Sequence, residues 1–130
     1  MSEALRYNQG KLKWSLVDFN SLEEMVKVLE YGAHKYSVFE DKDGNLIKGV
    51  DISVEEAKTL KCVRSGAHNW KLGMSKETIM NSLIRHIVAL QNEDSDSESK
   101  CNHMGHVMCN AMFYLFYHKK ECQETTTQQS

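Results

Sequence analysis

Two histidines and an asparagine near the end of the chain are the residues best suited to chemistry. His103, His106 and Asn110 occupy positions i, i+3 and i+7, so on a helix they form one polar stripe. Two imidazoles one helical turn apart can ligate a metal ion or contact a phosphate group. They could equally be partly exposed histidines at a helix start. We favour a functional role, because the stripe borders a methionine-rich apolar face rather than opposing it.

An acidic run just before this helix could hold a divalent cation. Carboxylates are the ligands that Mg²⁺ prefers, and Glu93, Asp94 and Asp96 supply them. Glu93 also follows His86 by seven residues, so both can face the same way if the preceding helix extends that far. The alternative is a solvated run that the helix dipole favours. We rank Glu93 and Asp94 above Asp96 and Glu98 as metal ligands.

Two charged side chains on other predicted helices are further candidates. Glu30 could be a ligand, although it also forms an ordinary surface pair with His34 at spacing i,i+4. Arg85 lies opposite the apolar side of its helix, which suits a phosphate group, a partner subunit or simple solvation.

A zinc site is a competing interpretation, because thiolates and imidazoles are zinc ligands. The candidates are Cys62, His68, Cys101, His103, His106 and Cys109. No two cysteines have CxxC spacing, so we rank zinc below the site of carboxylates and histidines. We expect all four cysteines to be reduced thiols.

Three amphipathic helices are expected to position these residues. The first is predicted to begin at Ser21, where the spacing fits a capping box, and to end near Tyr36. Ser75 is predicted to cap the second, and the last should extend from about Asn102 to His118. The side chains expected in the core are Trp14, Leu16, Val17 and Phe19 before the helices, then Leu22, Met25, Val26, Leu29, Ala33, Ile79, Met80, Leu83, Ile84, Ile87, Met104, Met108, Ala111 and Leu115.

The fold class indicated is all-α, a helical bundle in which facing side chains can build a site. We expect one domain over residues 1–120, with an insertion at about 37–68 and a flexible tail over 121–130. The absence of proline fits uninterrupted helices.

The insertion differs in pattern from the helices around it. Asp43-Gly44 lies between two apolar pairs and predicts a small β-hairpin. Ser53 and Glu56 have capping-box spacing and predict a short helix through about Cys62. Such an insertion could cover a pocket, alter its ligand or mediate assembly.

Composition limits the classes of function. A formal charge of −2 argues against broad electrostatic binding of nucleic acid. No apolar run approaches the roughly 18 residues of a membrane span, and no signal peptide is evident, so we expect no membrane partner and a cytoplasmic location. With 130 residues the chain is small enough to gain stability from assembly.

Several short segments, taken in their order along the chain, resemble the phage and bacterial dATP/dGTP diphosphohydrolase family of the MazZ type. That family is related to the MazG-like all-α nucleotide pyrophosphohydrolases. The segments are Arg6–Lys11, Tyr31–Tyr36, Asn69-Trp70 with Gly73, Arg85-His86, Glu93-Asp94, Glu98-Ser99, and His103 with His106.

The resemblance implies a MazG-like helical homo-oligomer, a dimer or larger, that hydrolyses the α–β bond of a purine (deoxy)nucleoside triphosphate. The products would be the monophosphate and pyrophosphate, with Mg²⁺ or Mn²⁺ required and the host cytoplasm as the location of a phage protein. A nucleotide-binding protein that sequesters its ligand without turnover is the alternative.

The resemblance also implies roles for individual residues. Glu30, Glu93 and Asp94 would hold metal or orient water, and His103 and His106 would bind metal or phosphate. The residues expected to contact substrate are Lys11, Lys35 and Arg85 at the phosphates, Tyr36 or Trp70 at the base, and His86 and Asn110 beside them.

Overall fold

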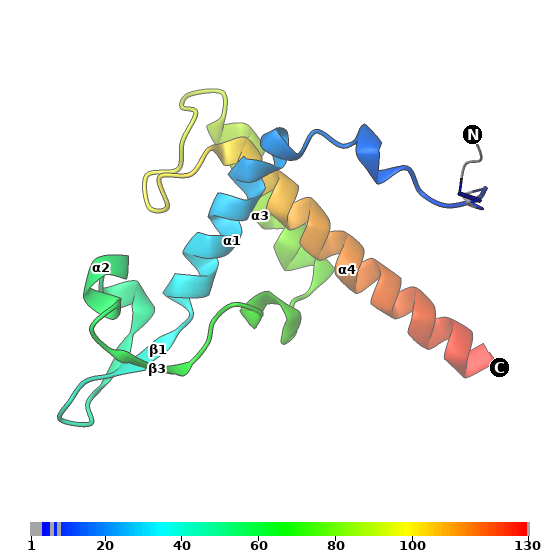
Figure 1. The fold of residues 1–130 in the computed structure, drawn as a ribbon. Helices are drawn as coiled ribbons and strands as arrows, with labels where there is room; N and C mark the ends of the chain where they lie inside the picture. Colours follow the sequence, from blue (N-terminus) through cyan, green and yellow to red (C-terminus); the bar gives the residue numbers. More distant parts are fainter. Residues whose placement is uncertain (1–3, 6, 8, 130) are drawn as a thin grey trace.

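Three long helices carry the fold. The computed structural model describes residues 4, 5, 7 and 9–129. Helix α1 (Glu23–Lys35) and helix α3 (Lys76–Ala89) both pack on helix α4 (His103–Gln129), as Figure 1 shows. The predicted predominance of helices is confirmed, but the chain is not all-α, because the predicted insertion forms a small antiparallel sheet.

Local capping signals explain where the helices begin. The Ser75 hydroxyl accepts a hydrogen bond from the Thr78 N–H at 3.1 Å, so the predicted cap of α3 is confirmed. The predicted start of the first helix at Ser21 is wrong. The Asp18 carboxylate accepts from the Ser21 N–H and caps a 3₁₀ turn, η2 (Phe19–Leu22), which leads directly into α1.

The insertion forms a three-stranded sheet in the order β2-β1-β3. The predicted hairpin is confirmed: β1 (Val38–Glu40) and β2 (Leu46–Lys48) pair antiparallel around a turn in which Gly44 has φ +83°. The predicted helix is shorter than expected, because α2 (Val54–Ala57) ends early and β3 (Lys61–Arg64) pairs with the other edge of β1. Pairing that edge satisfies backbone groups that would otherwise lack partners.

Short 3₁₀ turns join these elements. They are η1 (Trp14–Leu16), η3 (Gly49–Asp51) after β2, and η4 (Asn69–Lys71) before α3. In Figure 1 the segment before α1 extends away from the helices. Trp14, Leu16 and Phe19 are exposed, so the prediction that they dock on the core is wrong. Arg6 and Asn8 of the amino-terminal motif lie outside the described residues.

Helix α4 presents to the core a face that the amphipathic pattern did not indicate. Met104 and Leu115, predicted to be buried, are 48% and 53% exposed. The buried side chains of this helix include His103, Cys109 and Asn110. The polar stripe therefore faces inward, and the methionine-rich stripe beside it borders solvent.

Helix α3 shows a similar shift. Ile79 is buried as predicted, whereas Met80, Ile84 and Ile87 are exposed, because His86 takes the buried position one turn from the end of the helix. Helix α4 also continues to Gln129, well beyond its predicted end, and no proline or glycine interrupts that stretch. Among the described residues, no helix is long and apolar enough to cross a membrane.

Helices α1 and α4 approach each other closely at Gly105. A Cβ atom on this glycine would lie 2.5 Å from the Glu24 carbonyl oxygen, which is backbone of α1 and cannot turn aside. Beside this contact, Val28 of α1 forms a core cluster with Cys101 and Cys109, and Phe113 packs against it. The crossing of α1 over α4 thus depends on the absence of a side chain at one position.

We predict that Gly105→Ala destabilises the protein by about 1–3 kcal/mol, because the added methyl group forces the two backbones apart. Gly32→Ala is the matched control. Gly32 lies inside α1, and a Cβ atom on it would have nothing within 4 Å, so this change should stabilise by about 0.5–1 kcal/mol. Chemical denaturation measures both values, and equal effects of the two substitutions would contradict the close approach.

Candidate functional site

A cavity of about 560 Å³ lies where α1, α3 and α4 meet. The carboxyl-terminal half of α1, the segment from Gly66 to Trp70, the inner side of α3, the loop before α4 and the middle of α4 all line it. A volume of this size is typical of small-molecule sites. Most of the short segments singled out in the sequence converge here, although they are far apart along the chain. The predicted site residues in its lining are Lys35, Tyr36, Trp70, Arg85, His86, His106 and Asn110.

Helix α1 is tied to the loop before α4 by one carboxylate. Glu98 accepts hydrogen bonds from Lys35 Nζ at 2.9 Å and from the Tyr31 hydroxyl at 2.8 Å. These two bonds, with that of Lys35 the stronger, hold the pKa of Glu98 below its usual range. The Lys35 pKa is raised by the same contact. The cavity edge therefore carries an ionised pair that a charged ligand would meet.

The segment that joins the insertion to α3 lies against the end of α1. Its Gly66 N–H donates to the Ser37 hydroxyl at 2.9 Å, and that hydroxyl donates to the Ala33 carbonyl. A Cβ atom on Gly66 would lie 2.5 Å from the Ala33 oxygen, so only glycine allows this approach. Within the predicted insertion, only Gly66 and Ala67 line the cavity.

Trp70 and Tyr36 differ in how available their rings are. Trp70 stacks on Phe113 with ring centroids 4.7 Å apart and has its edge near Phe116. Its carbonyl also accepts a hydrogen bond from the Tyr117 hydroxyl. Trp70 is thus part of the cavity wall, whereas Tyr36 is 48% exposed and leaves ring surface open to a ligand.

Three imidazoles meet between α3 and α4. His86 Nδ1 lies 2.9 Å from His103 Nδ1, and the rings of His86 and His106 stack in parallel with centroids 4.1 Å apart. Burial, followed by the like charge of His106, lowers the pKa of His86 to about 4. Burial also lowers the pKa of His106. Both shifts favour the neutral form of the ring, which is the form that can ligate a metal ion.

The loop between α3 and α4 folds back toward these rings. Asp96 N–H donates to the Cys101 carbonyl and Lys100 N–H to the Asp96 carbonyl, both at 2.8 Å, with Lys100 in a left-handed conformation at φ 62°. The Asp96 carboxylate accepts from the Ser99 N–H at 2.8 Å. Ser99 Oγ in turn lies 2.7 Å from His106 Nε2. Burial alone would raise the Asp96 pKa, but the bonds from Ser99 and the nearby histidines lower it overall.

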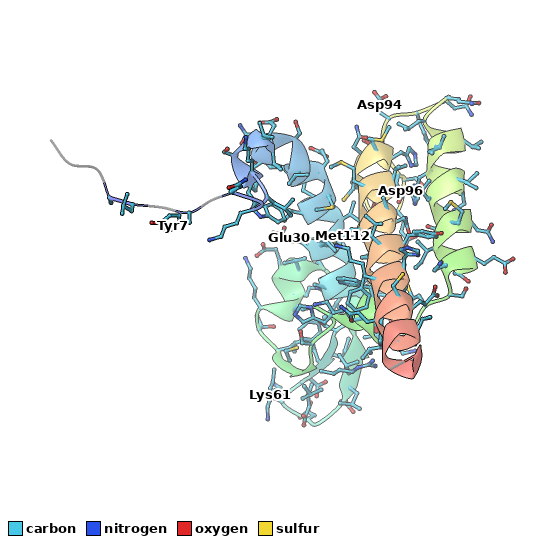
Figure 2. The ribbon with its side chains drawn as sticks, turned by 90° about the vertical axis from the view of Figure 1, so that its right-hand side faces the viewer. Tyr7, Glu30, Lys61, Asp94, Asp96 and Met112 are labelled. Atoms are coloured by element: carbon cyan, nitrogen blue, oxygen red, sulfur yellow. The ribbon has the colours of Figure 1, made fainter. Side chains whose placement is uncertain are left out.

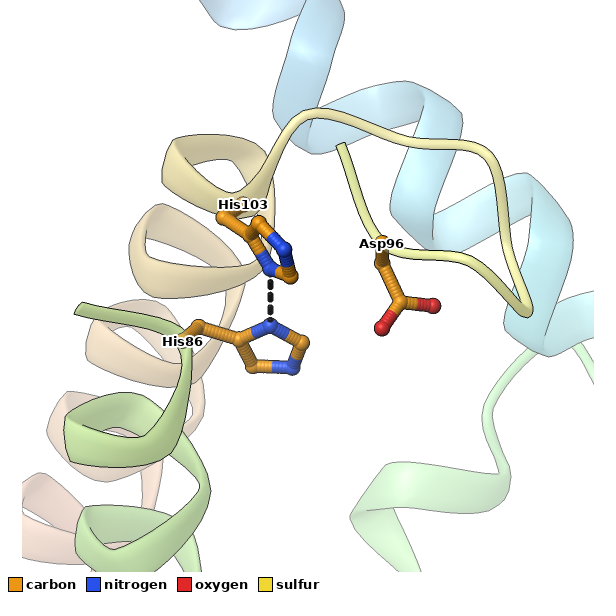
Figure 3. A group of neighbouring side chains, drawn as sticks. All are labelled: His86, Asp96 and His103. Atoms are coloured by element: carbon orange, nitrogen blue, oxygen red, sulfur yellow. Dashed lines mark hydrogen bonds between the residues drawn. The ribbon is translucent and has the colours of Figure 1, made fainter. Parts of the chain in front are cut away.

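His86, Asp96 and His103 form a cluster whose potential ligand atoms all lie within 4.8 Å of one another. Figure 3 shows the carboxylate of Asp96 on the side of the two rings that faces the loop. His103 is buried, and its Nε2 atom makes no hydrogen bond within the part of the chain that the structure describes. Glu93 Oε1, at 3.5 Å, is the acidic atom next to it.

The remaining predicted residues lie outside the cavity lining. Glu30, Glu93 and Asp94 are exposed, as is Lys11 in the segment before α1. Asp94 is labelled at the outer end of the loop in Figure 2, and its carbonyl accepts from the His103 N–H. Their catalytic, metal and substrate roles stay predictions.

Other lining residues were either ranked low or not singled out in the sequence. Asp96 and Glu98 were ranked below their neighbours, yet they are the two acidic side chains that line the cavity. Thr78 and Ser82 also line it, and they lie on the same side of α3 as Arg85. The i, i+4, i+7 spacing of these three polar residues is a signal that could have identified this wall.

The alternative zinc site does not assemble in the described part of the chain. Cys62 is exposed on β3, while Cys101 and Cys109 are buried beside α1. The cluster of His86, Asp96 and His103 contains no cysteine.

A helical protein with a cavity of this size, whose lining includes cations, carboxylates and imidazoles, has the features of a site for a small anionic ligand. Over residues 1–127 the chain matches the family described as dATP/dGTP diphosphohydrolase, N-terminal, and it belongs to that family. It is 26% identical over 113 residues to a protein of Salmonella phage PMBT28 named dATP/dGTP diphosphohydrolase. The match covers 86% of this chain but only 29% of the relative's length. No solved structure matches the chain.

We predict that the thiols of this protein differ sharply in reactivity. Burial raises the pKa of Cys109, in the cavity wall, to about 12, and Cys101 is buried beside it, whereas Cys62 and Cys122 are exposed. Iodoacetamide at pH 8 should therefore modify Cys62 and Cys122 first, and the other two only after denaturation. Peptide mass spectrometry reads out the order, and rapid labelling of Cys109 in the folded protein would show that the cavity wall is open.

Proposed function

We propose that this chain hydrolyses a purine deoxynucleoside triphosphate to the monophosphate and pyrophosphate. The observation that carries the proposal is the convergence of Lys35, Arg85, His86 and Asp96 on one cavity. Family membership and the name of the phage relative support the choice of dATP or dGTP. Because the chain matches less than a third of that relative, the activity of the whole relative is a proposal for this chain.

The phosphates would lie between α1 and α3. Lys35 on α1 and Arg85 on α3 both line the cavity and can neutralise phosphate oxygens from opposite walls. The base would lie against the open ring of Tyr36, because the ring of Trp70 is occupied by its contacts with Phe113 and Phe116. Asn110, which donates to the His106 carbonyl at 2.9 Å, keeps a side-chain oxygen for a polar contact at the cavity floor.

A divalent cation fits the donor groups beside the phosphate position. Asp96 offers a carboxylate whose pKa is lowered, and His86 and His103 offer ring nitrogens in the same cluster. When bound, such an ion polarises a phosphoryl oxygen and activates water. The His106 ring, which contacts Ser99 and whose pKa is lowered by burial, would accept the proton that the attacking water loses.

A panel of nucleotides tests this function. The protein is incubated with each dNTP and NTP plus Mg²⁺ or Mn²⁺, and the nucleotide products, pyrophosphate and retained nucleotide are measured together. Monophosphate and pyrophosphate from dATP or dGTP are the expected products. Tight retention of intact nucleotide would instead identify a non-catalytic binding protein, and neither result with any purine nucleotide would refute the proposal.

We predict that Lys35→Met lowers kcat/KM by roughly 10- to 100-fold, the effect of losing a charged hydrogen bond to phosphate. Lys48→Met, at an exposed position on β2, is the matched control and should retain full activity. Steady-state kinetics on the preferred dNTP compare the two. An unchanged kcat/KM for Lys35→Met would remove Lys35 from the substrate site.

A second prediction separates the four acidic residues of the loop. Asp96→Asn should abolish most turnover, because Asp96 alone among the four lies within the His86 cluster. The double change Glu93→Gln with Asp94→Asn should cost less, since both side chains are exposed. If the double variant is inactive while Asp96→Asn remains active, the catalytic carboxylates are Glu93 and Asp94 as the sequence suggested.

A homo-oligomer of this chain is also proposed, on the resemblance to its family. Light scattering coupled to size-exclusion chromatography gives the mass directly, and a single-chain mass at micromolar concentration would contradict it.

A further inference from the structure

We propose that His86, Asp96 and His103 bind one divalent first-row transition-metal ion in preference to Mg²⁺. The role of this ion in hydrolysis rests on the proposed function. Binding of the ion itself can be measured without nucleotide. It assigns the metal to a different set of residues from the one that the sequence favoured: His103 belongs to both sets, Asp96 was ranked below Glu93 and Asp94, and His86 was expected to contact substrate.

The distance between the two rings fits a shared ion. His86 Nδ1 and His103 Nδ1 lie 2.9 Å apart, a hydrogen-bond distance at which one proton is shared between the two nitrogens. Metal–nitrogen bonds are about 2.0–2.1 Å long, so both nitrogens reach one ion when the angle at the ion is near about 90°. A bound ion would therefore replace the shared proton without separating the helices, in a geometry that suits octahedral coordination.

His103 supplies an independent observation. Its side chain is only 3% exposed, and Nε2 is buried without a hydrogen bond among the described residues. A buried polar atom with no partner costs free energy in a folded protein. The neighbouring acidic groups, Asp96 in the cluster and Glu93 at 3.5 Å from Nε2, bring negative charge to the same place. Because Nδ1 is the atom that meets His86, it would be the ligand atom of His103. Nε2 would then carry the ring proton toward the Glu93 carboxylate, as the second nitrogen of a metal-bound histidine commonly does.

The donor set identifies the class of ion. Mg²⁺ takes oxygen ligands almost alone and keeps much of its water, which a pair of buried imidazoles does not suit. Two imidazoles with one carboxylate suit Mn²⁺, Fe²⁺, Co²⁺ and Zn²⁺ instead. Three ligands leave further coordination positions of an octahedral ion for water and phosphate oxygens on the cavity side.

The surrounding residues hold the three ligands in place. Asp96 accepts from the Ser99 N–H, and His106 stacks on His86 while it contacts Ser99 through Nε2. Outer contacts of this kind orient metal ligands and tune their affinity. The ligands also come from three consecutive parts of the chain, which are the end of α3, the loop and the first residue of α4 (Figure 3).

Electron paramagnetic resonance of Mn²⁺ tests the site in the absence of nucleotide. Titration of the full chain with Mn²⁺ should remove the free-ion signal up to one ion per chain, and a large excess of Mg²⁺ should displace it poorly. Asp96→Asn keeps the oxygen that accepts from Ser99 but removes the charge. It should weaken binding at least as much as the roughly 10- to 100-fold that loss of an outer-shell contact costs.

His103→Gln should have the same effect, and His118→Gln, at an exposed position on α4, is the matched control that should bind normally. Circular dichroism shows whether each variant is folded. If His103→Gln does not fold, the binding measured for Asp96→Asn alone tests the site. Absence of Mn²⁺ binding to the native chain, or unchanged binding by Asp96→Asn, would overturn the site. Binding without any nucleotide hydrolysis would uphold the metal site and refute only the proposed reaction.

Discussion

Three histidines meet between α3 and α4, and their contact determines which sides of the two helices face each other. Burying imidazole groups costs free energy unless each nitrogen has a partner. His86 meets His103 nitrogen to nitrogen and stacks on His106, so neither helix can rotate about its axis without uncovering a ring. This contact determines that α4 directs its polar stripe inward, although an apolar stripe lies beside it.

The loop and α1 follow from that contact. The loop must fold back for Ser99 to reach His106 and for Asp96 to approach His86, and its own backbone hydrogen bonds maintain that turn. Glu98, on the same loop, then reaches Lys35 and Tyr31 of α1. Cations, carboxylates and imidazoles from separate elements thus surround one cavity, which is the arrangement that binding and cleavage of a polyphosphate require.

Features encoded by a few adjacent residues could be predicted from the sequence. The cap at Ser75 and the hairpin turn at Asp43-Gly44 are of this kind, since each depends on contacts within four residues. The inward face of α4 could not be predicted in the same way. Hydrophobicity predicts that the methionine stripe is buried, whereas His103 and His106 are turned inward by contacts with His86 on α3 and Ser99 in the loop. The sequence ranked Glu93 above Asp96 for a similar reason. Both residues are acidic, and Asp96 comes close to His86 and His103 because of the turn of the loop, which the sequence does not reveal.

A crystal structure grown with Mn²⁺ and a dGTP analogue that has a non-hydrolysable α–β linkage would test the metal site and the nucleotide site together. We expect an anomalous manganese signal among His86, Asp96 and His103, with the triphosphate between Lys35 and Arg85. Manganese bound only by Glu93 and Asp94 at the surface, or the nucleotide outside this cavity, would contradict this expectation.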